Sequence, residues 1–159
     1  MLKLTKKADY GLIALKHLAV NDYVASAKEI ADTYHIPLPL LSKVLQKLTK
    51  GKFLKSEHGT NGGYRLARDP KTVTALEVIR LIDGPIFLTR CFTEHGDCSH
   101  TDRCIVREPL RKIHDGILRL LEGITIADMA SEDDTRLMRP EVSLDVLTAG
   151  SRVPVLQKH

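Results

Sequence analysis

Aromatic residues are scarce in this sequence, and tryptophan is absent. Aromatic side chains make up 4% of the chain, and no apolar run approaches membrane-spanning length. Surfaces that stack bases or sugars depend on aromatic side chains, so such a surface is not expected here. Residues 1–7 include basic side chains but neither the apolar stretch nor the cleavage site of a secretion signal. We therefore expect a cytoplasmic protein that does not contact a membrane.

Cysteine is also scarce, and it is confined to one segment. Cys91, Cys98 and Cys104 are separated by six and five residues. An odd number of cysteines without a secretion signal argues against a disulfide framework and favours metal binding or redox chemistry. Structural zinc sites use cysteine pairs about two to four residues apart, which is a closer spacing. Three separated thiolates can instead surround an iron–sulfur cluster of the [2Fe-2S] or [4Fe-4S] type, with zinc or redox-active thiols as alternatives.

Positive charge is concentrated in the first half of the chain, and the second half has a small excess of negative charge. Residues 1–90 hold 15 Lys and Arg against 8 Asp and Glu, whereas residues 91–159 hold 9 against 12. This asymmetry predicts that only the first half meets a polyanion such as nucleic acid. No pair of residues can be assigned acid and base roles, so we do not expect an enzyme.

The basic half has the pattern of three helices and a hairpin. Apolar spacing predicts helices over about 8–22 and 39–51, and a capping-box pattern at Ser26-Ala27-Lys28-Glu29 opens a shorter helix between them. Two short strands, 53–56 and 64–67, flank a glycine-rich turn. This order is the layout of a winged helix-turn-helix, so we predict a mainly α fold of that type.

The other half predicts a loop followed by a long helix. A helix that opens at Thr74 ends at Gly84-Pro85, and the cysteine segment follows. Apolar residues then step by four and three residues in a seam typical of paired helices: Val106, Leu110, Ile113, Ile117, Leu120 and Ile124. A narrow apolar stripe is better buried against a copy of itself than left in water, so we expect a homodimer.

These patterns divide the chain into four parts. We predict a DNA-binding domain over 1–85, a cluster-binding loop over 86–104, a dimerisation helix over 105–130 and a flexible polar tail over 131–159.

The polar face of the 39–51 helix suits double-stranded DNA. Side chains with hydrogen-bonding groups can read base edges in the major groove, whereas lysines meet phosphates, and the tip of the hairpin can reach a flanking groove. The candidate contacts are Lys28, Ser42, Lys43, Gln46, Lys47, Asn61 and Tyr64. A lysine-rich face that is merely solvated is the alternative, as is a zinc- or thiol-stabilised module that binds protein. The salt dependence of binding would distinguish DNA binding from protein binding, because counterion release makes affinity for DNA fall steeply as salt is added.

Several motifs together resemble the Rrf2 family of bacterial transcriptional regulators over about residues 2–125. They are Leu4-Thr5-x3-Asp9-Tyr10-Gly11-Leu12, the stretch from Ile36-Pro37 to Gly62-Gly63-Tyr64-Arg65-Leu66-Ala67, and the cysteine loop followed by Pro109-Leu110. The resemblance implies a dimeric winged-helix regulator of a pseudo-palindromic operator, whose DNA affinity depends on an iron–sulfur cluster. The chain is most similar to regulators of SUF-type cluster assembly genes, and nitric-oxide-sensing and iron-responsive members are near neighbours.

The resemblance also implies the cluster ligands. Cys91, Cys98 and Cys104 match the three thiolates, and Asp9 matches an aspartate that nitric-oxide-sensing members contribute across the dimer. Two features depart from the family pattern. The first cysteine interval is one residue longer than in better-known members, and Arg107 stands where one branch of assembly regulators carries a ligand histidine. Asp9 is therefore the expected fourth ligand, although an acid at a helix N-terminus also has a purely structural explanation.

Overall fold

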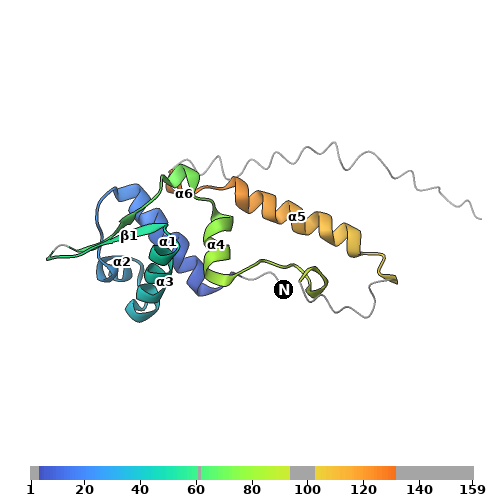
Figure 1. The fold of residues 1–159 in the computed structure, drawn as a ribbon, viewed down its shortest axis with the longest axis horizontal. Coiled ribbons are helices and arrows are strands. Elements are labelled where there is room, and N and C mark those ends of the chain that lie inside the picture. Colours follow the sequence, from blue (N-terminus) through green and yellow to red (C-terminus); the bar gives the residue numbers. More distant parts are fainter. Residues whose placement is uncertain (1–3, 61, 94–102, 132–159) are drawn as a thin grey trace, which may run out of the picture.

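The computed structural model describes residues 4–60, 62–93 and 103–131. The described part is mainly helical and has one two-stranded sheet (Figure 1). The elements in chain order are α1 (Lys6–Asn21), α2 (Ala27–Tyr34), α3 (Leu38–Lys50), β1 (Leu54–Glu57), β2 (Gly63–Leu66), η1 (Pro70–Thr72), α4 (Ala75–Asp83), η2 (Arg90–Phe92), α5 (Arg107–Gly123) and α6 (Ile126–Ala130). The predicted order of three helices and a hairpin is confirmed. The predicted tail lies outside the described residues, apart from Ser131.

Side-chain caps begin α1 and α2, whereas α3 begins after Pro37 without one. Thr5 Oγ1 accepts a hydrogen bond from the Ala8 amide at 3.3 Å, and Ser26 Oγ accepts one from the Glu29 amide at 3.1 Å. These caps satisfy amides that have no partner inside the helix. The Glu29 carboxylate does not complete the capping box at Ser26, because it accepts instead from the Tyr23 hydroxyl.

The core forms around α1, which packs against α3, α4 and α6. The larger side chains of this core are fully removed from water: Leu15, Leu18, Ile30, Leu41, Leu45, Leu48, Leu54, Val78 and Ile126. Burial of each such side chain stabilises the fold by about 1.5–3 kcal/mol before conformational entropy is counted. The core therefore fixes α3 against α1 and α4, with one face of α3 directed inward.

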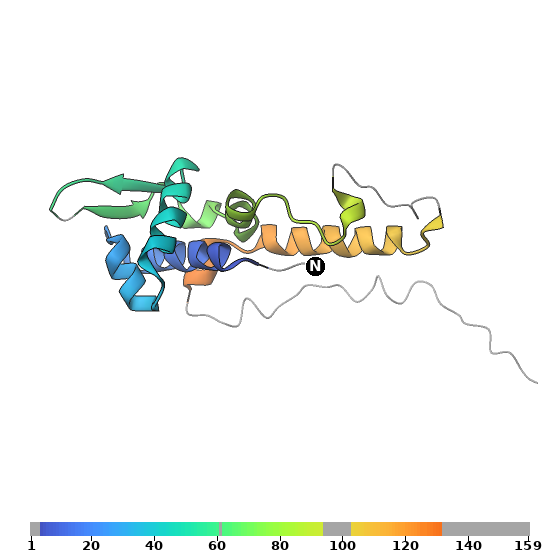
Figure 2. The ribbon, with the colours of Figure 1, turned by 90° about the horizontal axis from the view of Figure 1, so that it is seen from below.

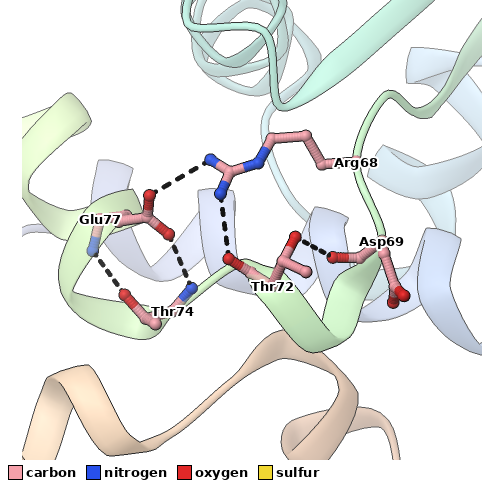
Figure 3. Close-up of polar contacts among 5 residues, drawn as sticks. All are labelled: Arg68, Asp69, Thr72, Thr74 and Glu77. Carbon is pink, nitrogen blue, oxygen red and sulfur yellow. Dashed lines mark hydrogen bonds and ion pairs between the residues drawn. The ribbon is translucent and has the colours of Figure 1, made fainter.

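The hairpin is tied to the body at both ends. Strands β1 and β2 pair antiparallel, with Leu54 opposite Leu66, and the Tyr64 amide donates to the carbonyl of Ala25 at 2.8 Å. At the other end, Arg68 Nη1 lies 3.2 Å from Glu77 Oε1 (Figure 3). Arg68 Nη2 also donates to the Thr72 carbonyl at 3.0 Å. The wing is thus anchored to the segment before α2 and to the first turn of α4.

The segment 105–130 contains two helices, where we expected one. Helix α5 extends away from the body as a long arm (Figures 1 and 2), and α6 lies against α1. Between them the chain is extended, and the Ile124 carbonyl accepts from the Ala75 amide at 2.8 Å. Thr125 then opens α6 with a complete capping box to Asp128. The α5 helix ends because this pairing and this cap satisfy the backbone better than another helical turn would.

Candidate nucleic-acid interface and cysteine segment

Helix α3 has a buried apolar face and an exposed polar face. Leu41, Val44 and Leu45 are buried in the core. On the rest of the helix, Lys43 and Gln46 are exposed and Ser42 is half-buried. A helix held in this way by its apolar face presents polar side chains that can enter a major groove. The structure thus leaves Lys43 and Gln46 accessible to a ligand.

Lys47 has a partner within the protein. Its Nζ donates to the carbonyl of Ile82, near the end of α4, at 3.0 Å. This contact joins residues 35 positions apart, and the sequence pattern held no signal for it because it depends on how α3 packs against α4. Lys47 therefore differs from Lys43, which lies one turn earlier on the same helix.

The other predicted DNA contacts lie on α2 and the wing. Lys28 is exposed in the first turn of α2, and Tyr64 is half-buried on β2. Asn61, at the tip of the wing, lies outside the described residues. Near the start of α2, the hydrogen bond from Tyr23 to Glu29 raises the pKa of the Tyr23 hydroxyl above its ordinary value, because the protonated form is the donor.

The cysteine segment is described at its two ends. Cys91 and Cys104 are both half-buried free thiols, and the Cys91 sulfur lies 2.9 Å from Thr89 Oγ1. Cys98 lies outside the described residues. Thiols are suitable donors for an iron–sulfur cluster. Among the residues that the structure describes, no group of three His, Cys, Asp or Glu side chains is close enough to hold a metal ion.

The candidate fourth ligand, Asp9, lies in the first turn of α1 and is exposed. The beginning of this helix is attached to the end of α4. The Asp83 carboxylate accepts from the Thr5 hydroxyl at 2.6 Å and from the Thr5 amide at 3.2 Å. Asp9 therefore lies one turn beyond a direct link to the helix that leads into the cysteine segment. Thr5 belongs to the motif that carries the family resemblance, but the sequence predicted no contact for it and gave no signal for Asp83.

An aromatic stack holds the start of the cysteine segment on α5. The His114 ring lies 6.5 Å from Phe87, nearly parallel to it, and 5.4 Å from Phe92. Two of the three phenylalanines of the chain take part in this stack. Their placement beside Cys91 in a sequence so poor in aromatic residues was the one signal that could have identified the stack.

Comparison with known proteins places the chain in a family. The model of the Rrf2 family, described as iron-dependent transcriptional regulator, matches residues 4–132. The HTH-type transcriptional regulator NsrR of Shouchella clausii is 32% identical over 141 residues, which are 86% of this chain and 95% of that protein.

The fold is also similar to solved structures of transcriptional regulators. The structure of CymR (YrzC), the global cysteine regulator of B. subtilis, is 30% identical, with a TM-score of 0.69 over 84% of this chain and 100% of that one. The structure of T. potens IscR is 29% identical, with a TM-score of 0.63 over 87% of this chain and 93% of that one. In the described part of the chain, no helix has the length and apolar character to cross a bilayer. The chain belongs to the Rrf2 family and is a DNA-binding transcriptional regulator with that family's winged-helix fold, not an enzyme.

Proposed function

We propose that this regulator acts as a homodimer whose affinity for a pseudo-palindromic operator is controlled by an iron–sulfur cluster on the cysteine segment. The two faces of α3 carry the proposal. Its apolar residues are buried, whereas Lys43 and Gln46 are exposed beside the anchored wing. We infer that α3 reads the major groove, with Ser42 and Gln46 facing base edges and Lys43 and Lys28 facing phosphates.

The cluster would be held by Cys91, Cys98 and Cys104. The half-buried free thiols of Cys91 and Cys104 support this assignment, as does the iron dependence named in the description of the family. When bound, such a cluster supplies a centre that can exchange electrons and be lost or modified. The residues of the chain position it: Phe87, Phe92 and His114 hold the start of the segment on α5.

The seam on α5 supports a homodimer. Val106, Ile113 and Leu120 are 51%, 53% and 58% exposed in the single chain. An apolar groove of about 320 Å³ lies alongside, between the end of α4 and α5, and Ile117, Leu120 and Leu121 form its α5 wall. A stripe of this kind is unfavourable in water, so we infer that a second copy covers it. A two-fold dimer presents two α3 helices, which accounts for a pseudo-palindromic operator.

The regulated genes that we propose are those for iron–sulfur cluster assembly, by the resemblance of the sequence to SUF-type regulators. A nitric-oxide-responsive repressor is a second candidate. It is favoured by Asp9, which is exposed at the start of α1, together with Arg107 at the position of the missing histidine. In either case, we propose that the partner subunit's Asp9 completes the ligand set.

Anaerobic purification tests the proposed function. The probe is the DNA fragment that the protein selects from a random-sequence pool. The wild type should carry iron and sulfide, and the triple variant Cys91→Ser, Cys98→Ser, Cys104→Ser should lose both. Its affinity for the fragment should change by about 5- to 150-fold, the usual size of coupling between two sites. Unchanged iron content, or unchanged affinity, would overturn the proposal. A nitric-oxide donor added to the wild type separates the two candidates, because only the second requires a change in affinity.

A further inference from the structure

The end of α4 is held by two other helices at neighbouring residues. Lys47 of α3 donates to the Ile82 carbonyl at 3.0 Å, and Thr5, the cap of α1, donates to the Asp83 carboxylate. Directly after this point, Gly84 turns the chain with a φ of 86°, and the next residues lead to Cys91. The last turn of α4 is thus the place where the recognition helix, the helix of Asp9 and the cysteine segment meet.

The contact from Lys47 has a physical basis. The last carbonyls of a helix have no partner inside it, and the negative end of the helix dipole attracts a cation. Lys47 supplies both a donor and a charge at this end. Lys47 is exposed, as Lys43 is, but its ammonium group is directed at a carbonyl of the protein, and this contact competes with a phosphate for the group.

The end of α4 has little freedom to move alone. Ile82 is buried, and its side chain packs so closely on α1 that a Cβ at Gly11 would lie 2.3 Å from the Ile82 Cδ1. A shift of the Ile82 backbone therefore pushes on α1 through this packing and pulls on α3 through Lys47. Close-packed interiors transmit such shifts because no empty space absorbs them.

We propose that Lys47 is a positioning residue, not a phosphate contact: it ties the recognition helix to the end of α4, so that α3 follows the state of the cysteine segment. This inference rests on the proposed function for the origin of the movement. The juxtaposition of Lys47 with Ile82, immediately before the cysteine segment, carries the assignment itself.

Paired substitutions on α3 test the proposal. Lys43→Gln and Lys47→Gln remove the same charge one turn apart on the same helix. Each lost phosphate contact makes the slope of log affinity against log salt less steep by about 0.9, so a homodimer that loses one contact per subunit should change by about 1.8. Lys43→Gln should show this loss on the selected fragment, whereas Lys47→Gln should keep the wild-type slope. A second readout is the ratio of two affinities for the selected fragment: that of the cluster-loaded protein and that of the same protein with the three serine substitutions. Lys47→Gln should bring this ratio towards one. Lys47→Arg, which keeps a cationic donor, should restore the ratio.

A slope that falls equally in both glutamine variants would overturn the inference, and so would an unchanged ratio in Lys47→Gln. A failure of the proposed function gives a different result. The three serine substitutions then leave the affinity of otherwise wild-type protein unchanged, while the salt slopes still decide whether Lys47 contacts a phosphate. Thermal unfolding of each variant confirms that the comparison is made between folded proteins. If Lys47→Gln does not fold, Lys47→Arg, which keeps a cationic donor for the Ile82 carbonyl, is measured in its place and should keep both the wild-type slope and the wild-type ratio.

Discussion

Gly63 shows how a single missing side chain decides where the wing lies. A Cβ at this position would come within 2.4 Å of the Ala25 carbonyl oxygen and within 2.7 Å of the Ala25 carbonyl carbon. Both atoms belong to the backbone, so they cannot turn away as the end of a side chain could. The neighbouring Tyr64 exchanges two hydrogen bonds with Ala25 at this point. The glycine therefore allows the wing to pair with the segment that precedes α2.

Gly63→Ala is expected to lower the free energy of unfolding by about 1–3 kcal/mol, the usual cost of an overpacked contact. Urea denaturation measures this change. Gly116→Ala is the matched control, because nothing lies within 4 Å of a Cβ at that position of α5. Within a helix, alanine is better than glycine by about 0.5–1 kcal/mol, so the control should be neutral or stabilised. Equal effects in the two variants would contradict the role assigned to Gly63.

At the scale of elements, α6 returns the chain to the body after α5. Its Ile126 is fully buried against the core, and its cap is reciprocal. Thr125 Oγ1 accepts from the Asp128 amide at 3.1 Å, while the Asp128 carboxylate accepts from the Thr125 amide at 2.9 Å. Because α6 packs on α1 while α5 contacts α4, this short helix fixes the end of α5 at the body.

Thr125→Ala should lower stability by about 0.5–2 kcal/mol, because the cap is lost and the Asp128 amide loses its partner. Thr33→Ala is the control. The Thr33 hydroxyl donates only to the Glu29 carbonyl within α2, and a bond of this kind adds little to a helix. Calorimetric unfolding of the two variants gives the comparison. A Thr125 variant as stable as the Thr33 variant would argue against the capping box as the device that ends α5.

At the scale of the whole molecule, the described part of the chain is an arm attached to a winged-helix body (Figure 2). The body buries a core of its own, whereas α5 has no fully buried residue in the described chain. Helix α5 contacts α4. Val106, Ile113 and Leu120, which belong to its apolar seam, are exposed. This arrangement is the physical basis for the proposed homodimer, because the arm carries these three exposed side chains at heptad-like spacing along one helix.

Ile113→Asp should convert the protein to a monomer, because a carboxylate in the seam would be desolvated without a partner. Sedimentation velocity measures the assembly state. Binding to a two-half-site fragment should weaken by roughly a hundredfold or more, since each half-site would then be bound independently. Lys112→Asp places the same side chain at the neighbouring, already exposed position, and it should leave the dimer intact. A dimeric Ile113→Asp variant would show that the seam is not the interface.

The sequence alone determined the helices and the hairpin of the body, because caps and apolar periodicity act between residues close in the chain. Ser26 and Thr74 cap helices where their spacing predicted, and Leu41, Val44 and Leu45 form the buried face of α3. The same local rules could have predicted α6, since Thr125 and Asp128 have capping-box spacing. The heptad spacing favoured one continuous helix, and this longer pattern obscured the cap.

Only the tertiary structure decided which polar side chains of the basic half bind distant parts of the chain. Lys43 and Lys47 are equivalent in the sequence and both are exposed, yet Lys47 reaches the carbonyl of Ile82. Likewise, the contact of Thr5 with Asp83 joins residues 78 positions apart. Such contacts depend on the angle and distance at which helices pack, and these are set by the whole core and not by any local run of residues.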